Sequence, residues 1–490
     1  MFSEQDWEAA PRLGNAYAAL PERFFERLSA KPVASPKCVV LNEKLASELG
    51  LDVTFLKSSA GTAMLAGNAF PENIEPLASA YAGHQFGEFV QELGDGRALL
   101  VGDVLDRDGR RREIQLKGSG PTKFSRAGDG RAALGPVLRE YVFSEAFAGL
   151  GLPTTRALGV IAHDGPVRRE TDLRGAVLAR VASSHVRIGT FEYFAARRDV
   201  EALELLASHV FEHLQPDLPL SRRSGLALLE AVIARQAELT ARWMLVGFVH
   251  GAMNTDNVTI SGETIDFGPC AFMDEYRSDA VFSSIDSGGR YAYGNQPRIT
   301  LWNLARFAGA LLPLIHPTRE DAIKLAEEAL ARFPYHYERV FYSGFRAKLG
   351  LAEREEGDIR LITDLLSLME QTSSDFTLTL RSLSDQLERP GQSHADGFED
   401  WCARWRERLG REDVDASELR DRMLKSNPKF IPRSHLVEVA IRAAVERDDF
   451  LPFTRLVEVV SNPYEDQPGQ EIYAAPPLEE ERVRQTFCGT

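Results

Sequence analysis

Two kinds of hydrophobic pattern divide the chain. Between residues 85 and 118, EFVQELGDGRALLVGDVL and REIQLKG contain short apolar alternations separated by Gly and Asp turns, a pattern typical of strands. The next segment, GPVLREYVFSEAFAGLGLP, begins with Pro136, repeats apolar residues at helical spacing and ends at Gly151 and Pro153. It therefore predicts an amphipathic helix. The segment GAVLARVA predicts a further strand.

Helical periodicity then dominates, from about 200 to 248 and again in RLITDLLSLMEQ and HLVEVAIRAAVE. A strand-rich segment with one inserted helix, followed by helices, predicts an α+β fold with the two-lobed layout of a protein kinase, although the pattern alone leaves other α+β folds open. We expect an N-terminal extension at 1–75, a kinase-like N-lobe at 76–180, a kinase-like C-lobe at 181–345 and a helical C-terminal extension at 346–490.

Composition narrows the classes of partner. The 490 residues carry a formal net charge of -15, which provides no basic field for nucleic acid or an anionic membrane. The start MFSEQDWEAAPRLG has no basic or apolar targeting pattern, and no stretch approaches the ~18 apolar residues of a membrane span. The sequence therefore predicts a cytoplasmic protein. The four cysteines are too scattered for a disulfide scaffold or a zinc site.

The stretch VHGAMNTDNVTISGETIDFGPC, residues 249–270, is similar to the catalytic and metal loops of a kinase with one part missing. A kinase has its catalytic Asp two residues after the His, where this chain has Ala252. A tight hairpin around the Ser-Gly-Glu turn would bring Asn257 and Asp266 together. Two oxygen ligands of this kind suit Mg²⁺, which completes its coordination with water and nucleotide phosphates.

Other residues fit the same chemistry. Lys117 ends a predicted strand and Glu140 lies in the following helix, the order in which a kinase restrains its phosphate-binding Lys with a carboxylate. Two Gly-rich turns could bring backbone N–H groups to phosphate oxygens, and Arg side chains gather nearby. These turns and arginines comprise Gly94, Gly96, Arg97, Arg126, Asp129, Gly130, Arg131, Arg180 and Arg187.

Several long blocks resemble the signatures of the selenoprotein O family (SelO, also called YdiU). They are YAGHQFGEFVQELGDGRALLVGDV, IQLKGSGPTKFSRAGDGRAALGPVLREY, GAVLARVASSHVRIGTFEYF and HGAMNTDNVTISGETIDFGPCAFMDEY, with NPKFIPRSHLVEVAI and SNPYEDQPG further on. The resemblance extends from about residue 80 to the C-terminus.

The resemblance implies a protein-kinase-like fold that binds ATP in a flipped orientation and transfers AMP, or in some reports UMP, to hydroxyl side chains of proteins. Asp256 would accept the proton, and Asn257 and Asp266 would hold Mg²⁺ or Mn²⁺. Glu140 would pair with Lys117. The residues expected to bind nucleotide are Gly94, Gly96, Arg97, Lys117, Asp129, Gly130, Arg180, Arg187 and Asp266.

Two cysteines add a regulatory hypothesis. Cys488 stands where some family members carry selenocysteine, and Cys270 directly follows the D-F-G-P sequence. We hypothesise that they form a reversible disulfide, because disulfides in the cytosol are usually regulatory.

Two other functions remain open from the sequence. The H-G-x-x-x-x-x-N and D-F-G motifs also resemble aminoglycoside-kinase loops, which would make the chain a small-molecule phosphotransferase. Ala252 counts against this function. A non-catalytic nucleotide-binding scaffold is the other alternative, and the retained Lys117, Asn257 and Asp266 count against it.

Overall fold

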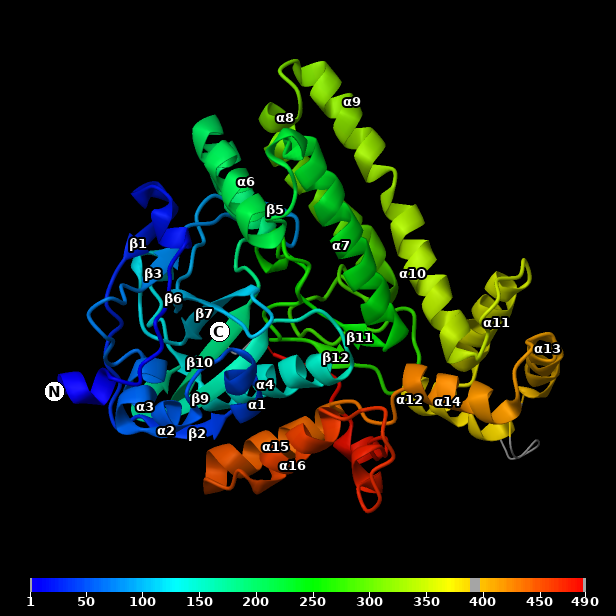
Figure 1. The fold of residues 1–490 in the computed structure, drawn as a ribbon. Helices are drawn as coiled ribbons and strands as arrows, with labels where there is room; N and C mark the ends of the chain where they lie inside the picture. The colour runs from blue at the N-terminus through cyan, green and yellow to red at the C-terminus, as the bar shows by residue number, and fades with distance from the viewer. Residues whose placement is uncertain (1, 388–396, 488–490) are drawn as a thin grey trace.

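A computed structural model describes residues 2–387 and 397–487 of the chain and has an α+β architecture, as predicted (Figure 1). An antiparallel sheet is built mostly from the first 182 residues, and helices make up most of the remainder. The strands are β1 (Phe25–Arg27), β2 (Lys37–Leu41), β3 (Leu77–Ser79), β4 (Gly83–Gln85), β5 (Glu88–Val90), β6 (Ala98–Leu105), β7 (Arg111–Lys117), β8 (Ala132–Ala133), β9 (Arg156–Arg168), β10 (Asp172–Ala182), β11 (Phe248–Val249) and β12 (Ala271–Phe272).

The main sheet has the strand order β1-β3-β6-β7-β10-β9-β2, and β8 pairs with β10. Its edge strands β1 and β2 come from the segment that the sequence analysis assigned to an N-terminal extension. The hairpin β4–β5 and the pair β11–β12 are separate two-stranded sheets. The predicted lobe boundaries remain predictions.

Helices follow the chain in three groups. The first comprises α1 (Glu43–Glu48), α2 (Val53–Lys57), α3 (Ser59–Ala66) and α4 (Leu134–Gly149). The second comprises α5 (Ile188–Ala196), α6 (Val200–Leu214), α7 (Gly225–Leu245), α8 (Gln296–Ile315) and α9 (Arg319–Leu330). The third comprises α10 (Phe333–Lys348), α11 (Asp358–Gln371), α12 (Phe376–Ser382), α13 (Glu399–Leu409), α14 (Ala416–Ser426), α15 (Ser434–Arg447) and α16 (Leu451–Val460).

The two faces of the sheet are covered by different helices. Along β10, Ala176 and Leu178 join the hydrophobic core around α4, whereas Val177 and Ala179 join the core formed with α1–α3. This alternation follows the period of two residues in a strand. The sheet is therefore buried on both faces near β9 and β10.

The helix predicted from GPVLREYVFSEAFAGLGLP is α4, but it is not amphipathic. Its polar residues Arg139, Glu140, Ser144 and Glu145 are buried together with its apolar ones. The sheet covers one side of α4, and α15 and α16 pack against it from another (Figure 1). A helix that is covered on several sides must find a partner for each buried polar group, and these partners lead to the site.

None of the helices in the described ranges is both long and apolar enough to cross a membrane.

The C-terminal helices contain a buried lysine that gives a test of the packing. Lys348, at the end of α10, is 4% exposed and its Nζ donates to the Ser426 carbonyl oxygen at 2.8 Å. Burial lowers the pKa of Lys348 from its ordinary 10.5 to about 7. Between these two values the unfolded chain binds more protons than the folded chain, so the lysine makes folding less favourable as the pH falls.

We expect the free energy of unfolding of the wild type to increase, relative to that of a Lys348→Met variant, by up to about 1.4 kcal/mol per pH unit between about pH 7 and 10. Denaturant titrations of both proteins across this range measure the difference. If the free energy of unfolding changed with pH in the same way in both proteins, the lowered pKa of Lys348 would be wrong.

Candidate active site

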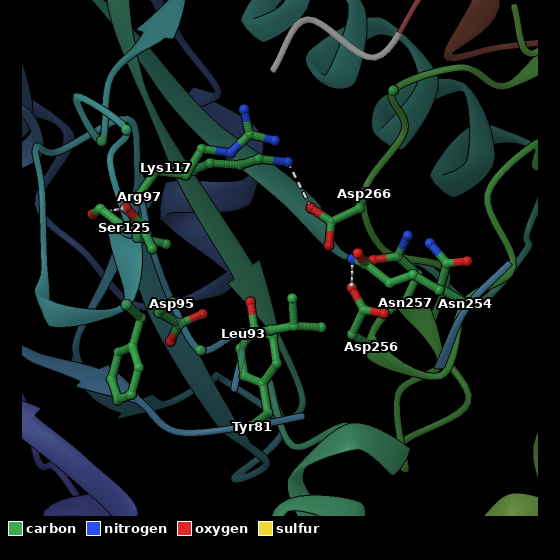
Figure 2. Close-up of a pocket in the computed structure, with 18 of the residues that line it drawn as sticks. Tyr81, Leu93, Asp95, Arg97, Lys117, Ser125, Asn254, Asp256, Asn257 and Asp266 are labelled. Atoms are coloured by element: carbon green, nitrogen blue, oxygen red, sulfur yellow. Dashed lines mark hydrogen bonds and ion pairs between the residues drawn. The ribbon is translucent and has the colours of Figure 1, made fainter. Parts of the chain in front are cut away.

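A cavity of about 630 Å³ lies between the sheet and the loops around residues 254–269 (Figure 2). Its walls include all the residues predicted to bind nucleotide or metal and the predicted base. These are Gly94, Gly96, Arg97, Lys117, Asp129, Gly130, Arg180, Arg187, Asp256, Asn257 and Asp266. Positions far apart in the sequence therefore meet in one place.

Asp266 is the centre of charge in the cavity. Its Oδ1 lies 2.6 Å from Lys117 Nζ and 2.8 Å from Arg180 Nη1, and its Oδ2 lies 3.0 Å from Arg187 Nη1. Burial raises the pKa of Asp266, but these three cations outweigh the burial and hold it well below its usual value. Asp266 also has a φ of +63°, an uncommon backbone conformation for a residue with a side chain.

Glu140 provides the second carboxylate. Its Oε2 accepts from Lys117 Nζ at 2.6 Å, and its Oε1 accepts from Arg180 Nη1 at 3.1 Å. The pair of Lys117 and Glu140 predicted from the sequence is therefore formed. It positions the end of β7 against α4 and keeps the ammonium directed toward Asp266.

The two arginines are fixed by separate elements. Arg180 on β10 is the cross-strand partner of Gln115 on β7, and its Nη2 donates to Gln115 Oε1 at 2.5 Å. Arg187 stands just before α5, and its Nη1 also donates to the backbone oxygen of Asp256 at 2.7 Å. Both guanidinium groups are almost fully buried. They are therefore structural parts of the cavity and not solvated surface charges.

Asp256 lies in the short helix η6 (Thr255–Asn257), on the same side of the cavity as Asn257 and Asp266 (Figure 2). Its Oδ2 accepts from Gln85 Nε2 at 3.3 Å, whereas its Oδ1 is buried and, within the described part of the chain, has no hydrogen-bond partner. Burial raises the pKa of Asp256 to about 6, and the Arg187 guanidinium opposes the shift. A buried carboxylate oxygen of this kind is suited to accept a proton from a ligand.

Asn257 and His250 complete the loop. The Asn257 side chain donates from Nδ2 to the Ala252 carbonyl oxygen at 2.9 Å, so its amide oxygen is left for another partner. His250 accepts at Nδ1 from the Ala252 N–H and donates from Nε2 to the Ile265 carbonyl oxygen. Burial lowers the pKa of His250. This histidine therefore joins the two halves of the loop as a neutral structural group.

The predicted hairpin between Asn257 and Asp266 forms differently. Thr259 forms an isolated bridge with Arg187 and Thr264 forms one with Thr154, so the two halves of the segment pair with other parts of the chain. The turn is instead closed by the Thr259 hydroxyl, which donates to the Glu263 carbonyl oxygen at 2.7 Å and accepts from the Glu263 N–H at 3.0 Å. Its two ends nevertheless line the same cavity.

The two Gly-rich turns pack tightly against neighbouring chain. At Gly94, with a φ of +66°, a Cβ atom would lie 2.2 Å from the Phe124 ring. At Gly130, with a φ of +65°, it would lie 2.2 Å from the Gly120 backbone. Both positions therefore require glycine, because the backbone has a positive φ and because a side chain would clash with its neighbour. Asp129 accepts from Arg169 Nη1 at 3.0 Å at the edge of the cavity.

Several residues of the cavity were not predicted from the sequence. Asp95 lies between the two predicted glycines and accepts from Gln115 Nε2 at 3.2 Å, and the Tyr81 ring lies 4.7 Å from the Arg187 guanidinium carbon. Asn254 accepts from the Tyr291 hydroxyl at 2.6 Å. A polar residue inside a Gly-rich turn was a usable signal for Asp95. The other contacts depend on tertiary structure.

The donor set fits a divalent cation bound together with a phosphorylated ligand. The Asp266 carboxylate and the Asn257 amide oxygen are hard oxygen ligands on the same cavity. Across residues 2–387 and 397–487, no group of three or more His, Cys, Asp and Glu side chains could hold a metal ion. A cation at this place would therefore draw its remaining ligands from water and phosphate.

The C-terminal tail lies beside the cavity. Thr486 Oγ1 donates to the Pro269 carbonyl oxygen at 2.6 Å, and the Thr486 N–H donates to the Phe282 carbonyl oxygen at 2.7 Å. Cys270, next to Pro269, is buried. Cys488 lies outside the described residues, so the predicted disulfide stays a prediction.

Comparison with known proteins agrees with these features. The family model described as protein adenylyltransferase SelO matches residues 11–461. The protein nucleotidyltransferase YdiU of Bradyrhizobium diazoefficiens is 54% identical over 483 residues, covering 97% of this chain and 98% of the relative. The protein of the same name from Agrobacterium fabrum is 52% identical over 485 residues, covering 98% of this chain and 100% of the relative.

These similarities indicate that the chain is a nucleotidyltransferase by class. The chain belongs to the SelO family.

The charge cluster gives a prediction about stability. An Asp266→Asn substitution would leave Lys117 and Arg180 with Glu140 as their carboxylate partner and Arg187 with only the longer contact to Asp95, at 4.0 Å. Removing one partner from a buried ion pair destabilises a protein by about 3–5 kcal/mol, and we expect a loss toward the lower end because the Asp266 side chain is 20% exposed.

Thermal unfolding measures this loss, and added pyrophosphate should restore part of it because the anion can pair with the three cations. Asp256→Asn is the matched control, since the Asp256 side chain makes no ion pair with them. An equal loss of stability in the two variants would contradict the assignment of Asp266 as the centre of the cluster.

Proposed function

We propose that the chain transfers AMP from ATP, or UMP from UTP, to Ser, Thr or Tyr hydroxyls of proteins. One observation supports this proposal: a single cavity contains two carboxylates in different electrostatic environments. Asp266 is held ionised by three buried cations, whereas Asp256 is buried with Oδ1 unpartnered within the described residues. Such a difference between neighbouring acids is typical of sites in which one binds charge and the other moves a proton.

The cations suit a triphosphate. Lys117, Arg180 and Arg187 bring three positive charges to the inner part of the cavity, and Arg97 lies on its wall. Guanidinium groups bind phosphate oxygens in pairs, and their charge stabilises a leaving pyrophosphate. When ATP enters, its phosphates can take over these cations from Asp266, which frees that carboxylate for a cation.

A bound Mg²⁺ or Mn²⁺ would neutralise phosphate charge, with Asp266 and Asn257 as its protein ligands. Asp256 would accept the proton of the acceptor hydroxyl while its oxygen attacks the α phosphorus. The new bond joins that oxygen to the α phosphorus, the bond to the bridging α–β oxygen breaks, and pyrophosphate leaves with the electron pair. Transfer of this kind depends mainly on positioning and on charge stabilisation.

The finer parts of the proposal rest on family membership together with this chemistry. We infer a protein-kinase-like, two-lobed fold in which ATP lies flipped relative to kinases, so that the α and not the γ phosphorus faces the acceptor. The absence of an Asp at Ala252 then needs no compensation, because Asp256 serves the acceptor hydroxyl. Protein acceptors are inferred from the same membership.

Two alternatives predict other outcomes. A small-molecule phosphotransferase would transfer the γ phosphate, and a nucleotide-binding scaffold would transfer nothing. The buried Asp256 favours a catalytic site over a scaffold, since an unpartnered buried carboxylate oxygen has an energetic cost that binding alone does not require.

The decisive experiment uses ATP labelled at the α or the γ phosphate, with Mg²⁺ or Mn²⁺ and a protein extract as the source of acceptors. We expect protein-bound label from the α position only, and its loss on addition of EDTA. Label from γ alone would establish a phosphotransferase, and label from neither would favour the scaffold.

In the same assay, Asp256→Asn should lower transfer by about 10²–10⁴-fold, the usual contribution of a general base. Exposed Asp421 on α14 offers a matched control, and Asp421→Asn should transfer like the wild type. A fully active Asp256→Asn variant would remove Asp256 from the mechanism.

We also propose that Cys270 and Cys488 form a regulatory disulfide. The contact between Thr486 and Pro269 supports it, because each of these residues is near one of the cysteines in sequence. Glutathione disulfide would oxidise both thiols and be reduced to two glutathione molecules. We expect peptide mapping after this treatment to find a 270–488 linkage that dithiothreitol removes. Mapping that finds both cysteines only as thiols or mixed disulfides would exclude it.

A further inference from the structure

The β4–β5 hairpin lies against the loop that carries Asp256. Among the described residues its strands pair only with each other, through Gly83 with Val90, His84 with Phe89 and Gln85 with Glu88. Because the hairpin is separate from the main sheet, its position depends on contacts with neighbouring elements.

Three successive hairpin residues contact three successive loop residues. The His84 N–H donates to Thr255 Oγ1 at 2.6 Å. The Gln85 side chain donates from Nε2 to Asp256 Oδ2 at 3.3 Å. The Phe86 N–H donates to Asn254 Oδ1 at 3.0 Å. The two backbone contacts fix the hairpin in register with the loop and leave the Gln85 side chain facing Asp256.

Both ends of this contact are anchored further. Glu192 on α5 accepts from Thr255 Oγ1 at 2.5 Å and lies 2.6 Å from His84 Nδ1, so one carboxylate holds both the loop and the hairpin. Gly83 lies so close to the loop that a Cβ atom there would be 2.7 Å from Asp256 Oδ1. The hairpin backbone is therefore part of the wall around the proposed base.

We propose that Gln85 is a positioning residue that donates to Asp256 Oδ2 and thereby fixes the orientation in which the Asp256 carboxylate meets the acceptor hydroxyl. This inference rests on the proposed role of Asp256 as the base. A carboxylate with both oxygens unrestrained can turn about its χ2 bond, whereas an amide donor on one oxygen fixes the plane of the group.

The two oxygens then have different tasks. Oδ2 is occupied by the Gln85 amide, and Oδ1 is buried beside Gly83 without a hydrogen-bond partner among the described residues. When Oδ1 takes the proton of the hydroxyl, Oδ2 becomes the carbonyl oxygen of the acid and still accepts from Gln85. The hydrogen bond is therefore compatible with both states of the reaction. Gln85 itself gains or loses no proton.

The test is a Gln85→Met variant, which keeps the length of the side chain and removes the amide donor. We expect kcat for AMP transfer to fall about 10- to 100-fold, the scale on which misplacement of a catalytic group acts. The KM for ATP should stay within about twofold, because the cations that hold the phosphates are not touched. Gln85→Glu, which presents an oxygen to the carboxylate, should be at least as slow.

A matched control is Gln91→Met, the same change at an exposed position just beyond the hairpin, which should leave kcat and KM unchanged. A second readout combines Gln85→Met with Asp256→Asn. If Gln85 acts through Asp256, the double variant should transfer as slowly as Asp256→Asn alone. If Gln85 had a merely structural role, the double variant would be slower than Asp256→Asn alone.

A Gln85→Met variant with wild-type kcat overturns the inference, and so does a Gln85→Met loss that persists in full on the Asp256→Asn background. Neither result affects the proposed function, which fails instead if Asp256→Asn itself remains active or if label is transferred only from the γ phosphate.

Discussion

The whole cavity depends on the burial of charge around Asp266. Three cations and two carboxylates from five separate segments meet there, and Lys117, Arg180 and Arg187 each contact Asp266 while Glu140 binds two of the three. Charges removed from water are tolerated only when they are well paired. The sheet register, α4 and the start of α5 must therefore all be correctly placed before any of these side chains is stable.

Much of this arrangement could be predicted from the sequence. The strand ending at Lys117, the helix containing Glu140 and the loop with Asn257 and Asp266 were identified because their residue types and their order match the pattern of a phosphate and metal site. The Gly-rich turns were found for a local reason, since Gly94 and Gly130 have backbone conformations that other residues rarely adopt. Local patterns and chemistry of this kind can be read without a structure.

Other features depend on contacts between distant segments, so no local pattern reveals them. Gln85 and Tyr81 look like ordinary residues of a short strand and a loop, and their contacts with Asp256 and Arg187 arise only in the folded chain. The periodicity of α4 predicted a helix correctly but suggested one exposed face. That face is buried because residues some 300 positions later in the sequence, in α15 and α16, cover it.

The enclosure of α4 limits how the protein could be controlled. Arg139 of this helix donates to the carbonyl oxygens of Gly268 and Cys270 and forms an ion pair with Glu438 of α15 at 3.2 Å. A rotation of α4 would break the contacts of Glu140 with Lys117 and Arg180. The same rotation would also break the ion pair between Arg139 and Glu438 of α15. The position of α4 is therefore fixed by both the site and the C-terminal helices. A control mechanism that moved α4 would therefore also have to move α15.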